Sequence, residues 1–138
     1  MSEDEIGRLV VDGAVRIHRG VGSGLLETVY EVVLAFELRR RGLQVERQIP
    51  IPVTYAGFRF EEGFRVDLIV NNKVIVELKS VDRLNNAHKK QLLTYLRLAD
   101  KRLGYLLNFG APMMRDGIIR IANRLPHQFQ RENPDLSP

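Results

Sequence analysis

The stretch VDLIVNNKVIVELKS, residues 66–80, contains two short apolar runs that flank an Asn-Asn pair. This pattern predicts two strands joined by a tight turn, because Asn tolerates the positive φ angles that such turns require. Three charged residues, Asp67, Glu77 and Lys79, interrupt the apolar runs. A buried charge without a partner costs several kcal/mol, so these three residues need a structural or functional reason.

The length of the turn decides whether the two carboxylates lie on one face, because side chains alternate between the faces of a strand. An odd-numbered loop centred on Asn72 places Asp67 opposite Glu77, with both side chains on one face. A two-residue turn would instead pair Asp67 with Val76 and separate the carboxylates, unless a bulge restores the phase. The sequence allows either loop.

Two adjacent carboxylates repel each other, and the arrangement is favourable mainly when a divalent cation lies between them. Lys79 lies two residues beyond Glu77 and shares its face in a regular strand, where an ammonium group can offset charge that builds on a phosphate. These residue types fit phosphodiester hydrolysis. The spacing alone is equally compatible with a half-buried salt bridge between Lys79 and one carboxylate.

The composition is that of an ordinary globular protein, with 138 residues, 44% hydrophobic and 28% charged. The absence of cysteine excludes disulfides, thiolate metal sites and a cysteine nucleophile, so a metal would be held by oxygen or histidine ligands. No apolar run approaches the length of a membrane span, and the acidic start MSEDEIG lacks an apolar signal region. We therefore expect a cytoplasmic protein without a membrane segment.

Apolar spacing along the rest of the chain predicts one mixed sheet with helices packed against it. Ser23 is a candidate N-cap for the second helix. We expect one domain over residues 1–125 and a polar tail over residues 126–138. The predicted helices cover residues 4–19, 24–41 and 85–101, and the further strands lie within residues 44–57, 58–63, 104–110 and 117–122.

The pattern VD…ELK resembles the core of the PD-(D/E)XK nuclease superfamily, in which one strand carries an acidic residue and the next carries (D/E)-x-K. The segment GLLETVY, with Gly24, Glu27 and Tyr30, is similar to the motif that names the GxxExxY family within that superfamily. Gln91 and Tyr95 match a Q-x-x-x-Y pattern on the helix after the catalytic strand. The resemblance extends from residue 6 to about residue 122.

This resemblance implies an α/β restriction-endonuclease-like fold, with a mixed central sheet flanked by helices, and metal-dependent hydrolysis of nucleic acid, DNA in preference to RNA. Asp67 and Glu77 would be ligands of Mg²⁺ or Mn²⁺, with Glu27 as a further acidic group. Lys79 would be the catalytic lysine, and Gln91 would position the site or the nucleic acid backbone. Val66, which precedes Asp67, stands where the superfamily motif often has proline.

Basic residues on two of the predicted helices are candidates for contact with backbone phosphates, with Tyr95 beside them. The alternative for the basic residues is a solvated helix face, and for Glu27, Gln91 and Tyr95 a surface or packing role. The expected nucleic-acid contacts are Arg39, Arg40, Arg41, Lys89, Lys90, Tyr95 and Arg97.

Two other functions remain open from the sequence. The same fold could serve as an inactive nucleic-acid-binding or assembly module, or the charges could form a purely structural network. The small size of the domain leaves little surface for substrate recognition, so we expect a homodimer or a partner protein that targets it.

Overall fold

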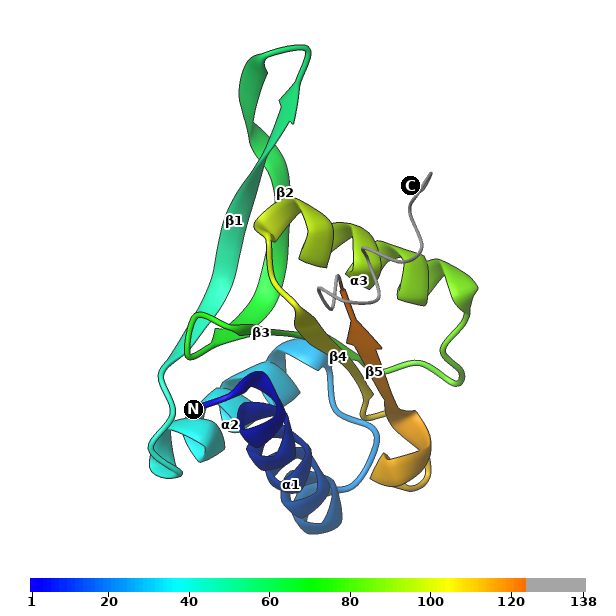
Figure 1. Cartoon of the computed structure of the whole chain (residues 1–138). Helices are drawn as coiled ribbons and strands as arrows, with labels where there is room; N and C mark the ends of the chain where they lie inside the picture. The colour runs from blue at the N-terminus through cyan, green and yellow to red at the C-terminus, as the bar shows by residue number, and fades with distance from the viewer. Residues whose placement is uncertain (124–138) are drawn as a thin grey trace.

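The structure, a computed structural model, describes residues 1–123, so the predicted polar tail lies outside the described residues. Five strands form one sheet in the order β1-β2-β3-β4-β5 (Figure 1). β3 and β4 are parallel, and the other neighbouring strands are antiparallel. The strands are β1 (Val45–Tyr55), β2 (Phe58–Val70), β3 (Val74–Lys79), β4 (Leu103–Asn108) and β5 (Ile118–Ala122).

Helices cover both faces of this sheet, as the sequence predicts. α1 (Glu3–Val21) and α2 (Glu27–Arg40) pack on one face, and α3 (Asn86–Ala99) packs on the other (Figure 1). A short 3₁₀ helix, η1 (Met114–Gly117), precedes β5. Within residues 1–123, no helix is long and apolar enough to cross a lipid bilayer.

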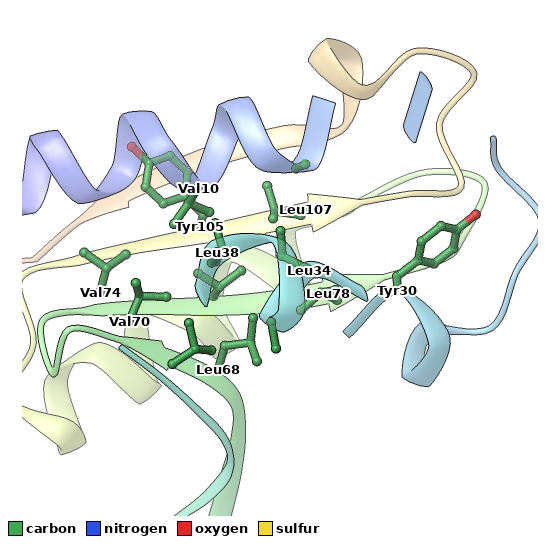
Figure 2. Packing of buried hydrophobic residues seen from close by; sticks show 14 of the residues in the cluster. Val10, Tyr30, Leu34, Leu38, Leu68, Val70, Val74, Leu78, Tyr105 and Leu107 are labelled. Carbon is green, nitrogen blue, oxygen red and sulfur yellow. The ribbon is translucent and has the colours of Figure 1, made fainter. Parts of the chain in front are cut away.

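Each face of the sheet has its own hydrophobic core. The larger core joins α1 and α2 to alternate residues of β2, β3 and β4, as Figure 2 shows for Leu34, Leu38, Leu68 and Leu78. The smaller core lies beneath α3. Its buried residues are Val66, Ile69, Ile75, Leu92, Leu96 and Leu106. Because side chains alternate along a strand, residue 77 of β3 lies on the same face as Ile75, towards α3.

The β2–β3 hairpin has the odd-numbered loop. Val70 pairs with Val74, and the loop residues Asn71 and Asn72 have φ angles of 50° and 55°. This register places Asp67 directly opposite Glu77, just beyond the last pair of the ladder. The odd-numbered loop, one of the two that the sequence allows, is therefore confirmed.

The start of α2 differs from the sequence prediction. The N-cap is Leu26, without a side-chain cap, and Ser23 does not cap the helix. The Tyr30 side chain fastens this loop instead: its hydroxyl donates to the Gly22 carbonyl at 2.6 Å and accepts from the Leu25 N–H at 3.2 Å. The predicted cap was wrong because a side chain one turn into the helix satisfies the loop.

Replacing Tyr30 by Phe tests this fastening. The fully buried ring would keep its stacking on Phe109, at 4.3 Å between centroids, but the two loop groups would lose their partner. We expect the free energy of unfolding to fall by about 1–3 kcal/mol, measured by urea denaturation. Tyr55→Phe, at a side chain that is 75% exposed, is the matched control and should change little. Equal stability of both variants would contradict the assignment.

Candidate functional site

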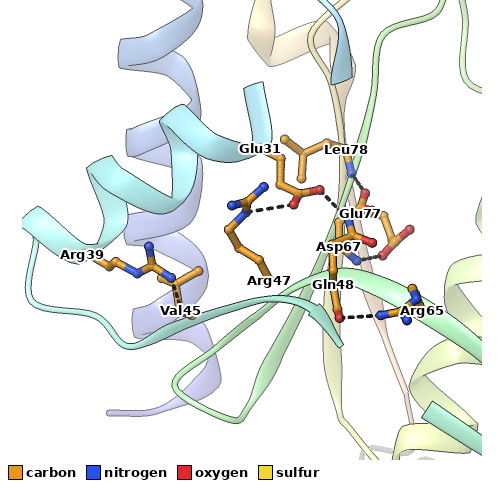
Figure 3. A network of polar contacts seen from close by, with 9 residues as sticks. All are labelled: Glu31, Arg39, Val45, Arg47, Gln48, Arg65, Asp67, Glu77 and Leu78. Carbon is orange, nitrogen blue, oxygen red and sulfur yellow. Dashed lines mark hydrogen bonds and ion pairs between the residues drawn. The ribbon is translucent and has the colours of Figure 1, made fainter. Parts of the chain in front are cut away.

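Asp67 and Glu77 lie where β2 and β3 separate. The last pair of their ladder is Leu68 with Val76, and beyond it the carboxylates bind backbone N–H groups. The Asp67 N–H donates to Glu77 Oε2 at 2.7 Å, and the Leu78 N–H donates to Asp67 Oδ2 at 2.9 Å (Figure 3). Each strand therefore holds the carboxylate of the other in a fixed position.

A second break, in the β1–β2 ladder, lies on the other side of Asp67. The Gln48–Asp67 pair is skipped, although the pairs on either side of it are formed. Gln48 has a φ of 52°, which takes its backbone out of the extended conformation. Its side-chain amide donates to Glu31 Oε1 at 2.8 Å and to Asp67 Oδ1 at 3.4 Å.

Glu31 is a component of this network that the sequence analysis missed. The residue is 4% exposed, and its other carboxylate oxygen accepts from Arg47 Nε at 3.0 Å (Figure 3). A signal was present, because Glu31 shares the core-facing side of α2 with Leu34 and Leu38. A charged residue in an apolar pattern is the same signal that identified Asp67.

Burial raises the pKa of Glu77 to about 8, and the neighbouring charge of Asp67 adds to this effect. The hydrogen bond from the Asp67 N–H and the charge of Lys79 oppose it only in part. Burial also raises the pKa of Asp67, and the Glu31 charge contributes. The site therefore holds two carboxyl groups that are costly to ionise together and that a cation would stabilise.

Lys79 lies at the end of β3 and is half-buried. Its charge lowers the pKa of both Asp67 and Glu77, so the amine lies near the pair. Within residues 1–123, none of the ion pairs joins Lys79 to either carboxylate. The salt-bridge alternative is thus not what the structure shows.

Glu27 lies beside this site rather than in it. The side chain is exposed, and Oε2 accepts from the Ser80 N–H at 3.2 Å. Ser80 in turn donates its hydroxyl to the Leu25 carbonyl at 3.0 Å. Glu27 therefore contacts the chain directly after Lys79. Among the described residues, no three His, Asp or Glu side chains are grouped as a ready-made metal site.

The two α3 residues of the Q-x-x-x-Y pattern lie on the α3 side of the sheet. Tyr95 stacks on Phe64 with 4.1 Å between ring centroids. Burial raises the pKa of Tyr95, and the negative charges of Glu77 and Asp67 add to this effect. Gln91 lies one helical turn earlier on α3 and is exposed.

The basic residues expected at nucleic acid fall into two groups on opposite layers of the molecule. The first group, on α3, is exposed and consists of Lys89, Lys90 and Arg97. The second group ends α2 and is partly engaged with the protein itself. In it, Arg39 donates to the Val45 carbonyl at 2.7 Å, Arg40 lies 5.7 Å from the Phe36 ring centre, and Arg41 pairs with Glu37 at 2.8 Å.

The model of the PD-(D/E)XK nuclease superfamily matches residues 4–121, and the chain belongs to this superfamily. Its mixed sheet flanked by helices is the restriction-endonuclease-like fold that the resemblance implied. No curated protein matches the chain. A similar solved structure, described as "Crystal structure of SSO0001", has 19% identity and a TM-score of 0.44, and the match covers 89% of this chain and 68% of that one.

Members of the superfamily generally use divalent metal ions and act on nucleic acid. The residues present fit such an ion, since Mg²⁺ is commonly held by one or two carboxylates and completes its shell with water and substrate phosphates. Asp67 and Glu77 supply two carboxylates from adjacent strands, and their raised pKa values show how poorly the protein alone compensates their charges.

Replacing Glu77 by Gln should change how stability depends on pH. An acid with a raised pKa binds more protons in the folded state than in the unfolded state, so the free energy of unfolding falls as pH rises between the two values. For Glu77 that interval runs from 4.5 to about 8. Each pH unit within it is worth at most about 1.4 kcal/mol.

We expect wild-type protein without metal to lose a few kcal/mol across this interval, and Glu77→Gln to show a flatter profile in urea denaturation at a series of pH values. The raised pKa of Asp67 leaves some slope in the acidic part. Glu61→Gln, at a side chain that is 71% exposed, is the control. Parallel profiles for wild type and Glu77→Gln would show that the carboxyl is not destabilised by its surroundings.

Proposed function

We propose that this protein is a metal-dependent nuclease that hydrolyses phosphodiester bonds of nucleic acid, with DNA as the substrate. The observation that supports it most directly is the pair of carboxylates, half-buried Asp67 and buried Glu77, held side by side near Lys79. Membership of the PD-(D/E)XK superfamily supports the same reaction class. We further place the chain in the GxxExxY family because Gly24, Glu27 and Tyr30 match the motif that names this family.

Asp67 and Glu77 would hold Mg²⁺ or Mn²⁺, which supplies Lewis acidity for water activation and neutralises charge on the phosphate. Their backbone hydrogen bonds keep both carboxylates oriented, so little rearrangement is needed when the ion binds. Lys79 would orient the attacking water and stabilise negative charge that develops on the phosphate oxygens. Glu27 would be the further acidic group at the edge of the site.

The substrate would lie along the α3 side of the sheet. Gln91 and Tyr95 would position the scissile phosphate, since both lie on α3, which covers the face of the sheet that carries residue 77. The exposed Lys89, Lys90 and Arg97 would bind neighbouring phosphates without reading sequence. The Arg39–Arg41 group lies on the other layer, so it would contact a more distant part of a long substrate. A homodimer or targeting partner remains a prediction.

Cleavage assays on Lys79→Ala test the catalytic assignment. We expect metal-dependent nicking of plasmid DNA to fall by about 100-fold or more, because the amine is proposed to act in the transition state. Lys101→Ala is the matched control, because Lys101 contacts Asn72 at the opposite end of the β2–β3 hairpin. Thermal melting would verify that both variants fold. Undiminished cleavage by Lys79→Ala would reject the role, and nucleic-acid binding without any wild-type cleavage would favour the inactive module.

The roles of Glu27 and Glu31, two of the acidic residues of α2, can be distinguished by the response of their variants to Mn²⁺. A metal that binds the native state raises the melting temperature, so the concentration dependence of this shift reports affinity. We expect Glu27→Gln to weaken the shift with little change in stability without metal, because the residue is exposed. Glu31→Gln should lower stability without metal, because buried Glu31 binds Arg47 and Gln48. An unaltered Mn²⁺ response in Glu27→Gln would remove Glu27 from the metal site.

A further inference from the structure

The outer part of the β1–β2 hairpin, residues 53–60, projects from the body of the molecule, and we call it the arm (Figure 1). Its three aromatic side chains are highly exposed: Tyr55 by 75%, Phe58 by 70% and Phe60 by 48%. Tyr55 pairs with Phe58, and Val53 pairs with Phe60. Paired residues and alternate residues share a face, so these four side chains form one apolar face of the arm.

The opposite face of the arm is polar. It carries Thr54 and Arg59, and Arg59 Nε pairs with Glu61 Oε2 at 2.6 Å. The arm is therefore amphipathic although it covers no core of its own. Contiguous exposed apolar surface on a monomer usually marks a binding site, and a two-stranded ribbon gains little stability by itself in water.

The apolar face of the arm continues into the proposed active site. A bulge lies below the arm, between the pair Val53–Phe60 and the pair Ile51–Phe64. The two pairs are two residues apart on β1 and four residues apart on β2. Both steps are even, so alternation carries the same face through the bulge. Ile51 and Phe64 pack against the core beneath α3, and Phe64 stacks on Tyr95. The exposed rings of the arm thus share a face of the hairpin with Phe64, which stacks on Tyr95 of α3, and we call these side chains the aromatic row.

The exposed basic residues on the α3 side of the sheet favour a polyanion as the ligand. The exposed Lys89, Lys90 and Arg97 of α3 lie on the same side of the sheet as the Phe64–Tyr95 stack. A second copy of the chain docked on this face would bring like charges, whereas nucleic acid brings phosphates for the basic residues and bases for the rings. Stacking on a side chain requires a free base face, which a paired base inside a duplex does not offer.

We propose that the arm binds single-stranded nucleic acid by stacking unpaired bases on Tyr55, Phe58 and Phe60. This inference rests on the proposed function and specifies its substrate class as single strands or duplexes with an unpaired segment at the arm. The bound strand follows the aromatic row to Tyr95, and its backbone lies against the basic side of α3.

The chain contains no tryptophan, so Phe58→Trp introduces a single tryptophan at the tip of the arm, whose emission can be excited selectively over that of the four tyrosines. Combined with Lys79→Ala to prevent cleavage, it would be titrated with a thymidine oligonucleotide of about 15 nucleotides, within the range that single-strand-binding surfaces cover. Saturable quenching is expected with the single strand, and little with a duplex of equal length. Val32→Trp, at a 50% exposed valine of α2 on the other layer, is the matched control and should not respond.

Removing the rings provides the second measurement. Tyr55→Ala combined with Phe58→Ala should weaken binding of the single strand about tenfold or more, because stacking accounts for a large share of affinity for each base. Duplex binding should be unchanged, and thermal melting should show a folded protein, because both side chains are exposed. Cleavage of single strands by the otherwise wild-type double variant should fall in parallel with binding.

Absence of quenching at Phe58→Trp, or equal loss of single-strand and duplex binding, would overturn the proposal. Sedimentation that shows a dimer, together with a concentration-dependent blue shift of Phe58→Trp without nucleic acid, would identify a second copy as the occupant instead. Plasmid nicking by wild-type protein separates the proposed nuclease function from the proposed binding by the arm. Normal nicking without quenching at Phe58→Trp rejects only the binding by the arm. Quenching without nicking by the wild type rejects the nuclease but keeps the binding surface.

Discussion

The site depends on two adjacent interruptions of the sheet around Asp67. In an uninterrupted antiparallel sheet, residues 48 and 67 would pair, and β2 would continue beside β3 beyond Leu68. Here the Gln48–Asp67 pair is skipped and the β2–β3 ladder stops. The N–H groups of Asp67 and Leu78 then bind carboxylates. The fold thus uses backbone donors, which no side-chain mutation removes, to orient two acidic groups.

The hydrogen bonds from backbone N–H groups do not offset the free-energy cost of burying the ionised carboxylates. The pKa of Glu77 is raised to about 8 even though a hydrogen bond and the charge of Lys79 both lower it. The nearby buried Glu31 adds a further negative charge. A site that was optimised for stability would pair these charges or replace them by apolar residues. The arrangement is instead one that a divalent cation would complete, and strongly raised carboxyl pKa values of this kind cluster at functional positions.

Much of the fold could be predicted from the sequence because it follows from local patterns. The apolar runs around Asn71 and Asn72 predict the hairpin, and the register with the odd-numbered loop follows from one of two allowed turns. Gly63, in contrast, suggests a turn but lies inside β2 at the bulge, where a Cβ would collide with the Ile51 carbonyl. The sequence therefore predicts two separate strands where the structure has the single strand β2. A glycine signals an unusual backbone need, but the sequence does not say which one.

The site was less accessible to sequence analysis because part of it is built by tertiary contacts. Nothing in ERQIP around Gln48 indicates a positive φ, which arises only where β1 turns away from Asp67. The position of Glu31 on the apolar side of a predicted helix indicates a buried charge. Glu27, one turn earlier, was selected from the sequence instead because it fits the GxxExxY motif. The structure places both on α2, where Glu31 supports the network at Gln48 and Glu27 supports Ser80.

The residues Gly24, Glu27 and Tyr30 acquire a common physical meaning in this arrangement. Gly24 has a φ of 135°, which side chains rarely permit, and so allows the loop to reach α2. Tyr30 fastens that loop through its hydroxyl, and Glu27 binds the N–H of Ser80. Together they attach the start of α2 to the chain directly after Lys79. If Lys79 acts as proposed, this attachment would help to hold its amine in place at the end of β3. Gly24, Glu27 and Tyr30 therefore fix the chain beside Lys79, whichever acidic side chain would contact the proposed metal ion.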